Sequence, residues 1–367
     1  MTIILGIEST AHTFGVGIVK DGKVLSNVKR TYTTKKGGII PIEAAKHHNQ
    51  NKSQIYSEAL ETAKIKETEI EAIAFSQGPG LAPCLLEGMR FAKELSKKLN
   101  KPLVPVNHCV AHLEIGRLTK ANDPVMLYAS GANTQIIAYE AGKYRVFGET
   151  LDIGVGNFID TFARYAGIGF PGGPVIEKLA QESKKYIELP YKVKGMDVAL
   201  SGILTNLKQK LEKINIIPTP PPSKKLVNSK SHDTNYSLSD LAYSMQETVF
   251  AMLVETAERA LAHTGKKELL LGGGVACNSR LQEMCKIMCK ERGAKFFCPE
   301  RPLLVDNAAM IAFLGEIMFN SLSLSHPPTR EKKINKTISK LIYFPKDLDK
   351  IDIMPRQRTD EVGVSWK

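Results

Sequence analysis

The sequence predicts an α/β fold made of two duplicated lobes with a ligand cleft between them. The chain has 367 residues, 43% of them hydrophobic and 24% charged, a globular composition long enough for two domains. Segments with the alternation of strands are followed by segments with the period of helices, which is typical of α/β layers. A pattern of strand, polar turn, strand, hairpin and strand occurs twice, with Gly22-Lys23 of the first copy aligned on Gly142-Lys143 of the second.

The first copy accounts for the N-terminal elements. Three strands are predicted, at Ile4–Glu8, Phe14–Lys20 and Val24–Tyr32. The glycine of the turn between the last two fits the positive φ of a tight hairpin. Two helices and an intervening strand follow, at Pro41–Ala63, Gly80–Leu99 and Ile70–Phe75.

The second copy repeats this order. Its three strands are predicted at Val125–Ala129, Gln135–Tyr139 and Tyr144–Glu149. Two helices and a buried strand follow, at Ser239–His263, Asn278–Cys289 and Glu268–Leu271, and a further apolar helix at Ala308–Met318. Two such lobes would meet at a cleft, where ligands usually bind.

The expected domains follow from this reading. An N-terminal lobe covers 1–122 and a C-terminal lobe covers 123–305, with a mobile proline- and lysine-rich insert at 214–236. We expect the helix at 306–322 and the C-terminal segment to complete the N-terminal lobe. Residues 323–367 form a basic tail.

Charge and composition exclude several classes of protein. A net charge of +12 permits a polyanionic partner such as RNA or DNA. Six cysteines are too few for a disulfide scaffold and indicate a reducing cytoplasm. We find neither a signal peptide nor an apolar run of about 18 residues, so no membrane span is expected.

His108 and His112 form the clearest candidate metal site. Their four-residue spacing places both imidazoles on one face of a helix, within reach of one ion. Two such ligands need oxygen or sulfur partners. Cys109 stands where a zinc protease has its glutamate, which argues against that class.

Other polar residues lie at the ends of predicted elements. The turn Ser130–Thr134 could hold a phosphate or carboxylate through its backbone amides. The glycine loop Gly272–Asn278 could pack against a nucleotide. Asp160, Glu177 and Asp306 are candidate functional carboxylates, although Asp306 by itself would be expected to cap the helix that follows it.

These motifs resemble one family. They are Gly6–Thr13, Ser76–Leu81, Asn107–His112, Gly156–Asp160, Gly169–Gly173, Gly272–Asn278 and Leu304–Met310. In order and spacing they resemble the tRNA N6-adenosine threonylcarbamoyltransferase family, in its archaeal and eukaryotic branch of KEOPS catalytic subunits. The resemblance implies the actin-like fold of the sugar kinase, Hsp70 and actin superfamily. The likeness extends from Ile3 to Leu322 and resumes at Pro355–Trp366.

The resemblance also implies an activity, namely transfer of threonylcarbamoyl from its adenylate to the adenosine adjacent to the anticodon in tRNAs reading A-starting codons. One divalent ion, iron or zinc, would be bound by His108, His112, Tyr128 and Asp306. The residues implied for threonylcarbamoyl-adenylate are Tyr128, Ala129, Ser130, Gly131, Ala132, Asp160, Gly173, Glu177 and Asn278. No residue is assigned as general base. The implied partners are tRNA, a small atypical kinase, a small dimerising subunit and a tRNA-binding subunit.

Two departures from the family pattern and two alternative functions stay open. Ile42 follows Pro41 where the family usually has arginine, and the insert at 214–236 looks longer than usual. The chain could instead be an ATPase or small-molecule kinase of the same fold, although Glu8-Ser9-Thr10-Ala11 replaces the usual Asp-x-Gly-Thr. It could also be a non-catalytic nucleic-acid-binding subunit. The lysines expected to contact RNA are Lys224, Lys225, Lys230, Lys332, Lys333 and Lys336.

Overall fold

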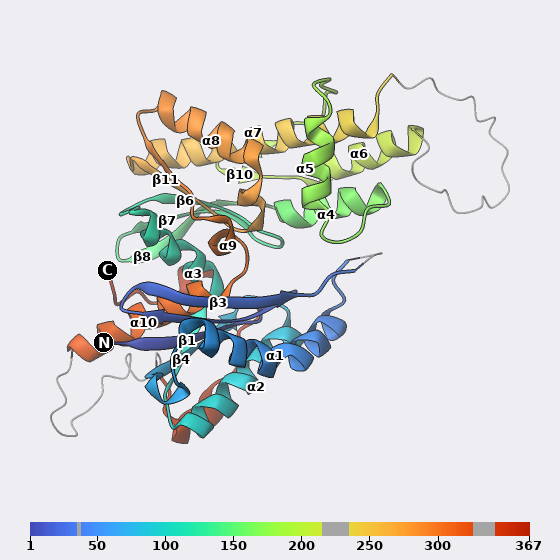
Figure 1. The fold of residues 1–367 in the computed structure, drawn as a ribbon. Coiled ribbons are helices and arrows are strands. Elements are labelled where there is room, and N and C mark those ends of the chain that lie inside the picture. The colour runs from blue at the N-terminus through green and yellow to red at the C-terminus, as the bar shows by residue number, and fades with distance from the viewer. Residues whose placement is uncertain (35–37, 215–234, 326–341) are drawn as a thin grey trace.

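The computed structural model describes residues 1–34, 38–214, 235–325 and 342–367. Two lobes lie one above the other, each built on a five-stranded mixed sheet (Figure 1). The predicted α/β duplication is therefore confirmed. The six lysines expected to contact RNA, at 224, 225, 230, 332, 333 and 336, lie outside the described residues.

The N-terminal sheet has the strand order β3-β2-β1-β4-β5. Its strands are β1 (Ile3–Glu8), β2 (Thr13–Lys20), β3 (Lys23–Thr31), β4 (Ala72–Gly78) and β5 (Leu103–Asn107). Strand β1 runs antiparallel to β2 and parallel to β4. Two helices, α1 (Pro41–Ala63) and α2 (Ala82–Leu99), cover one face of this sheet (Figure 1).

The C-terminal sheet has the equivalent order, β8-β7-β6-β11-β12. Its strands are β6 (Val125–Ala129), β7 (Thr134–Glu140), β8 (Lys143–Glu149), β11 (Glu268–Gly272) and β12 (Lys295–Phe297). The helices of this lobe are α4 (Val155–Tyr165), α5 (Gly173–Gln181), α6 (Ser201–Lys213), α7 (Leu238–Thr264) and α8 (Ser279–Glu291), beside a small ribbon of β9 (Val193–Lys194) and β10 (Asp197–Val198). The prediction omitted α6, although Ile203, Leu207 and Leu211 recur at helical spacing and are buried.

The two matching hairpins have the same backbone geometry. Asp21 and Gly22 have φ values of 47° and 76°, and Ala141 and Gly142 have values of 50° and 79°. Positive φ at both central residues defines the two-residue turn that suits the twist of paired strands. The local sequence therefore determines the hairpin in both lobes.

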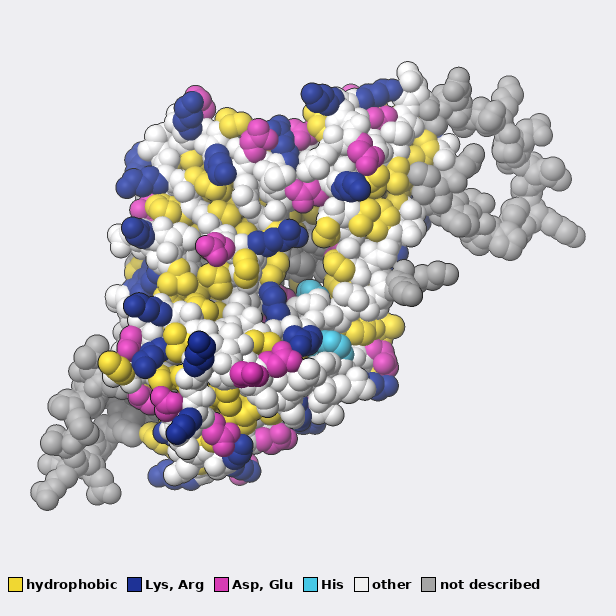
Figure 2. Space-filling model, in the orientation of Figure 1, with side chains coloured by type: hydrophobic (Ala, Val, Ile, Leu, Met, Phe, Trp, Pro, Cys, Tyr) yellow, Lys and Arg dark blue, Asp and Glu magenta, His cyan; other side chains and the backbone are white. Residues whose placement is uncertain are grey.

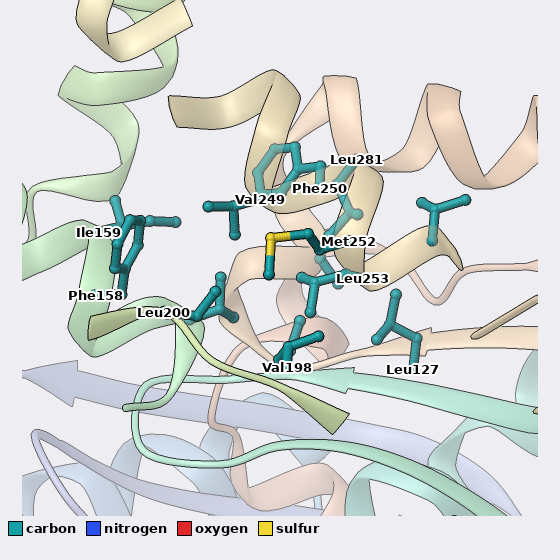
Figure 3. Packing of buried hydrophobic residues seen from close by; sticks show 14 of the residues in the cluster. Leu127, Phe158, Ile159, Val198, Leu200, Val249, Phe250, Met252, Leu253 and Leu281 are labelled. Carbon is teal, nitrogen blue, oxygen red and sulfur yellow. The ribbon is translucent and has the colours of Figure 1, made fainter. Parts of the chain in front are cut away.

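The core of the C-terminal lobe lies between its sheet and its helices. Figure 3 shows side chains of α4, α7 and α8 that converge on the sheet, among them Phe158, Phe250 and Leu281. Leu127 of β6 belongs to the same cluster and is fully buried. Burial of such side chains stabilises each by about 1.5–3 kcal/mol.

Helix α10 (Ala308–Ser325) packs on the sheet of the N-terminal lobe, although it follows the C-terminal lobe in sequence. Gly6 and Gly17 lie opposite each other on β1 and β2. A Cβ atom at Gly6 would lie 2.3 Å from the backbone nitrogen of Ala312, and one at Gly17 would lie 2.5 Å from that of Ala309. The two glycines thus let the helix backbone contact the strands directly.

The C-terminal segment contacts both lobes, whereas the sequence led us to expect it within the N-terminal one. Its first part pairs Tyr343 with Leu103 of β5. Its last part reaches the C-terminal lobe, where Thr359 Oγ1 lies 3.2 Å from Gln135 Oε1 of β7. The course of the C-terminal segment is set by hydrogen bonds and side-chain contacts to residues far away in the sequence. A helical or strand period does not encode such contacts.

The shorter helices lie at the junctions between larger elements. They are α3 (His108–Glu114), α9 (Arg301–Leu304) and the 3-10 turns at Glu67–Glu69, Ile115–Thr119, Gly274–Cys277, Pro345–Lys350 and Thr359–Glu361. In the part of the chain that the structure describes, no helix combines the length and the apolar character needed to cross a membrane.

Candidate metal and substrate site

Helix α3 presents the histidine pair. Strand β5 ends at Asn107, whose side chain accepts a hydrogen bond of 3.0 Å from the Val110 amide and so caps the helix. The imidazole centroids of His108 and His112 are 4.8 Å apart, as their spacing predicts. Both side chains are buried, so water competes little for their nitrogens.

Asp306 reaches the pair from the turn between α9 and α10. Its Oδ1 lies 3.4 Å from His108 Nε2 and 3.5 Å from His112 Nε2. The expected capping role belongs to Asn307, whose side chain accepts a 3.0 Å hydrogen bond from the Met310 amide. The Asp306 carboxylate is therefore free to face the imidazoles.

Glu8, at the end of β1, orients His108. Its Oε2 lies 3.0 Å from His108 Nδ1, and its Oε1 accepts from the Thr10 amide at 2.7 Å. Burial opposes a charge on His108, but Glu8 and Asp306 outweigh it and raise the pKa of the imidazole well above its ordinary value. A bond from Nδ1 to a carboxylate leaves Nε2 directed at the other ligands, as is usual for metal-binding histidines.

The remaining buried atoms of the group fit a metal ion. His112 Nε2 and the Tyr128 hydroxyl are two of the buried side-chain polar atoms of the described residues that lack a hydrogen bond of ordinary geometry. The ring of Tyr128, on β6, is centred 5.1 Å from that of His112. A buried polar atom without a partner costs about 1–3 kcal/mol, which coordination would offset. Candidate ligand atoms of His108, His112 and Asp306 all lie within 4.8 Å of one another.

The turn after β6 is held rigidly. The amides of Gly156 and Asn157, at the start of α4, donate to the carbonyls of Ser130 and Gly131 at 3.0 and 2.9 Å. A Cβ atom at Gly156 would lie 2.7 Å from the Gly131 Cα atom, so helix and turn are in direct contact. The fully buried Ala129 precedes the turn, while Gly131 and Ala132 are exposed at its tip and accessible to a ligand.

A second group of predicted residues lies on α4, α5 and α8. Asp160 Oδ1 accepts a 2.8 Å hydrogen bond from the Gly172 amide, just before Gly173 begins α5. Burial raises the pKa of Asp160. These contacts hold the start of α5 against α4.

Helices α5 and α8 are joined through Glu177. Its Oε1 accepts bonds from Ser279 N and Oγ at 2.8 and 2.7 Å. The side chain of Asn278 caps α8 and donates to Gln246 Oε1 at 2.9 Å. Asn278 therefore already has structural partners, whereas the Glu177 carboxylate keeps capacity for further donors.

Two residues of the site received no role from the sequence. Glu8 closes an apolar strand and stands where kinases of this fold have the aspartate of Asp-x-Gly-Thr, and these two signals could have identified it. Lys29 is half-buried on β3, and its Nζ donates to the Asp306 carbonyl at 3.0 Å. Burial lowers the pKa of Lys29. Nothing in the pattern of β3 distinguishes this lysine from a solvated one.

Comparisons with known proteins agree with this geometry. The sequence model of the TsaD family, described as tRNA N6-adenosine threonylcarbamoyltransferase, matches residues 23–313. The protein of that name from Thermococcus sibiricus is 54% identical over 364 residues, covering 99% of this chain and 100% of the relative. A probable tRNA N6-adenosine threonylcarbamoyltransferase of Drosophila melanogaster is 46% identical over 371 residues, covering 100% of this chain and 99% of the relative. This chain also matches 60% of a probable bifunctional tRNA threonylcarbamoyladenosine biosynthesis protein of Methanosarcina mazei, at 47% identity over 369 residues.

Solved structures of low sequence identity share the fold. HypF of T. kodakarensis superposes with a TM-score of 0.56 at 14% identity, covering 87% of this chain and 48% of that one. Component A of the Acidaminococcus fermentans (R)-2-hydroxyglutaryl-CoA dehydratase superposes with a TM-score of 0.52 at 14% identity. The match covers 86% of this chain and 97% of that one. These similarities confirm the expected actin-like fold. On the family match and the identities, the chain belongs to the tRNA N6-adenosine threonylcarbamoyltransferase family, whose members are acyltransferases.

Proposed function

We propose that this chain transfers the threonylcarbamoyl group from threonylcarbamoyl-adenylate to the N6 amine of the adenosine next to the anticodon, in tRNAs reading A-starting codons. The observation that carries the proposal is the group of two buried imidazoles, His108 and His112, and the partly buried Asp306 carboxylate beside the buried Tyr128 ring, in a chain of this family. We propose cytoplasmic localisation as well, since tRNA is the acceptor.

The donor set fits one divalent ion, iron or zinc. Imidazole nitrogen suits both metals, and a carboxylate and a phenol oxygen would complete the set with His108, His112, Asp306 and Tyr128. When bound, such an ion polarises a carbonyl oxygen as a Lewis acid. The chain's own contribution is to fix the ligands, because Glu8 orients His108 and Lys29 holds the backbone at Asp306.

The remaining predicted residues would bind the adenylate. The turn of Ser130, Gly131 and Ala132, which is exposed at Gly131 and Ala132, offers small residues to an anionic group, and its backbone hydrogen bonds with the start of α4 would preorganise it. Tyr128 and Ala129 lead into this turn. Asp160, Gly173, Glu177 and Asn278 would hold the nucleoside part, and the Glu177 carboxylate suits ribose hydroxyls.

The reaction forms one bond between heavy atoms and breaks one, and a proton leaves the attacking amine. The N6 amine of adenosine attacks the carbamoyl carbon, the bond from that carbon to the phosphate oxygen breaks, and AMP leaves with the electron pair. The amine loses its proton to a base. Exclusion of water from the buried group would limit hydrolysis of the reactive anhydride.

The ATPase alternative is disfavoured by the role of Glu8. Its carboxylate is fully buried and bonded to His108 and Thr10, so it belongs to the histidine group. A carboxylate that positions the magnesium ion of a bound nucleotide would need to face that nucleotide.

Labelled threonylcarbamoyl transfer tests the proposed function directly. The full chain, with candidate partners, is given synthetic threonylcarbamoyl-adenylate and tRNA. We expect label on the adenosine next to the anticodon and release of AMP. Release of ADP from ATP without labelled tRNA would favour a kinase or ATPase, and RNA binding without either would favour a non-catalytic subunit.

We further propose that the chain acts with a small atypical kinase, a small dimerising subunit and a tRNA-binding subunit, as KEOPS catalytic subunits do. The outer faces of α1 and α2 are candidate docking surfaces. The isolated chain should then transfer poorly, and adding the partners should allow many turnovers. A time course of tRNA labelling measures this, and sustained turnover by the chain alone would contradict partner dependence.

Replacement of Glu8 by glutamine should weaken metal binding while leaving the fold in place. Loss of an orienting partner typically costs 10–100-fold in metal affinity, and we expect about 30-fold here. Competition with a coloured chelator measures the affinity. Glu316→Gln is the matched control, because this buried carboxylate of α10 accepts from Gly22 instead. Equal affinities in both variants would remove Glu8 from the site.

A further inference from the structure

A pocket of about 430 Å³ opens on the C-terminal lobe beside the turn that carries Asp306. Its walls include Cys277 from the turn before α8, Lys286 from α8, and Arg301 and Leu304 from α9. Helix α9 lies between the two lobes (Figure 1).

Two of the pocket residues lie on the chain segments that carry the candidate site. Leu304 precedes Asp306 by two residues, and Cys277 directly precedes Asn278. From the other lobe, Lys29 Nζ contacts the Asp306 carbonyl at 3.0 Å. A strand whose reacting base enters the cleft could therefore place its neighbouring groups in this pocket.

Two positive charges line the pocket without an ion-pair partner among the described residues, and the Lys286 ammonium lies 5.7 Å from the centre of the Phe296 ring. Arg301 and Lys286 are exposed and form no ion pair with any described residue, while Glu300 is the acid on the rim. Some arginines of this lobe are paired, as Arg280 is with Glu247 at 2.8 Å and Arg292 with Glu258 at 3.0 Å. Figure 2 shows Lys and Arg side chains on the rim of the hollow between the lobes, with histidine visible at the hollow.

We propose that this pocket binds phosphodiester groups of the RNA strand adjacent to the adenosine that is modified. Arg301 offers the fork of donors that suits a phosphate, and Lys286 adds a second positive charge. The pocket is open to solvent, so a continuous strand can pass through it. The inference rests on the proposed function, because it needs an RNA acceptor at the cleft.

The test compares the full chain with its Arg301→Gln/Lys286→Gln variant. Binding of an anticodon stem-loop RNA is measured by fluorescence anisotropy over a range of salt concentrations. Each lost phosphate contact should flatten the logarithmic salt dependence by about one unit, so we expect about two units and roughly tenfold weaker binding at low salt. Lys143→Gln/Lys194→Gln removes the same charge from exposed positions outside the pocket and should change the slope little.

Two further measurements keep the outcomes distinct. Glu300→Gln removes the rim acid and should strengthen RNA binding, which misfolding could not produce. AMP affinity should not change in the double variant, and a loss of AMP affinity with unchanged RNA binding would assign the pocket to the nucleotide phosphate instead. An unchanged salt slope in a double variant of normal thermal midpoint would overturn the inference. If the salt slope is unchanged in the double variant but the parent chain labels tRNA, the proposed function stands and only the inference about the pocket fails.

Discussion

Replacement of both α3 histidines by alanine should remove the metal ion and reduce threonylcarbamoyl transfer by about a thousandfold. Carbonyl polarisation by a metal supplies several kcal/mol, and about 4 kcal/mol corresponds to that factor in rate. His108 and His112 supply two of the proposed ligands, and of the described His, Cys, Asp and Glu residues only Asp306 has a ligand atom that lies within 4.8 Å of both. Metal content by mass spectrometry and labelled transfer, both on the purified variant with partners, measure the two effects.

The control for this prediction must separate metal loss from misfolding. His263→Ala changes an exposed histidine of α7 and should keep both metal and activity. His112→Gln keeps most of the side-chain volume, so it should retain the thermal midpoint while it loses metal. Stoichiometric metal in the double alanine variant would show that these histidines are not the ligands.

Gly6→Ala should destabilise the protein by about 3 kcal/mol, at the upper end of ordinary overpacking effects. The added methyl would lie 2.3 Å from Ala312 N and 2.5 Å from Ala308 O, and these backbone atoms cannot move without shifting α10. Because α10 follows Asp306 directly, the same shift should also lower metal affinity. Thermal and urea unfolding of the full chain measure the loss of stability.

Gly202→Ala is the matched control for the glycine prediction. Gly202 lies in the first turn of α6, and a Cβ atom there would meet no atom within 4 Å. Alanine is the better helix former, so this variant should be neutral or more stable by about 0.5 kcal/mol. Equal midpoints for the two variants would show that α10 does not pack tightly on β1.

Much of the fold could be predicted because it is encoded locally. The hairpins at Gly22 and Gly142 have turn residues that specify their geometry, and α1 has the predicted bounds, Pro41–Ala63. Helix α10 shows the limit, since it continues to Ser325, beyond the apolar stretch that ends at Met318 and beyond the expected bound at 322. Polar and apolar residues alternate after Phe319, and this alternation does not mark the end of the helix.

The candidate site could be predicted in part. The spacing of His108 and His112 is sufficient to place both rings on one face of α3. Roles for Tyr128, Asp160 and Glu177 came from the family resemblance, because single polar residues at element ends carry no specific signal. The sequence also favoured Asp306 as a helix cap, which the structure assigns to Asn307.

The duplicated α/β pattern, the two hairpins and the histidine pair are encoded in short stretches of sequence, since each depends on residues that are close in the chain. Only the tertiary structure brought Asp306, Glu8 and Lys29 to that pair and opened the pocket at Arg301. These groups meet because α10 crosses back onto β1 and β2, where Gly6 and Gly17 allow close contact. Contacts of this kind depend on the packing of whole elements against each other, and no local period of the sequence records them.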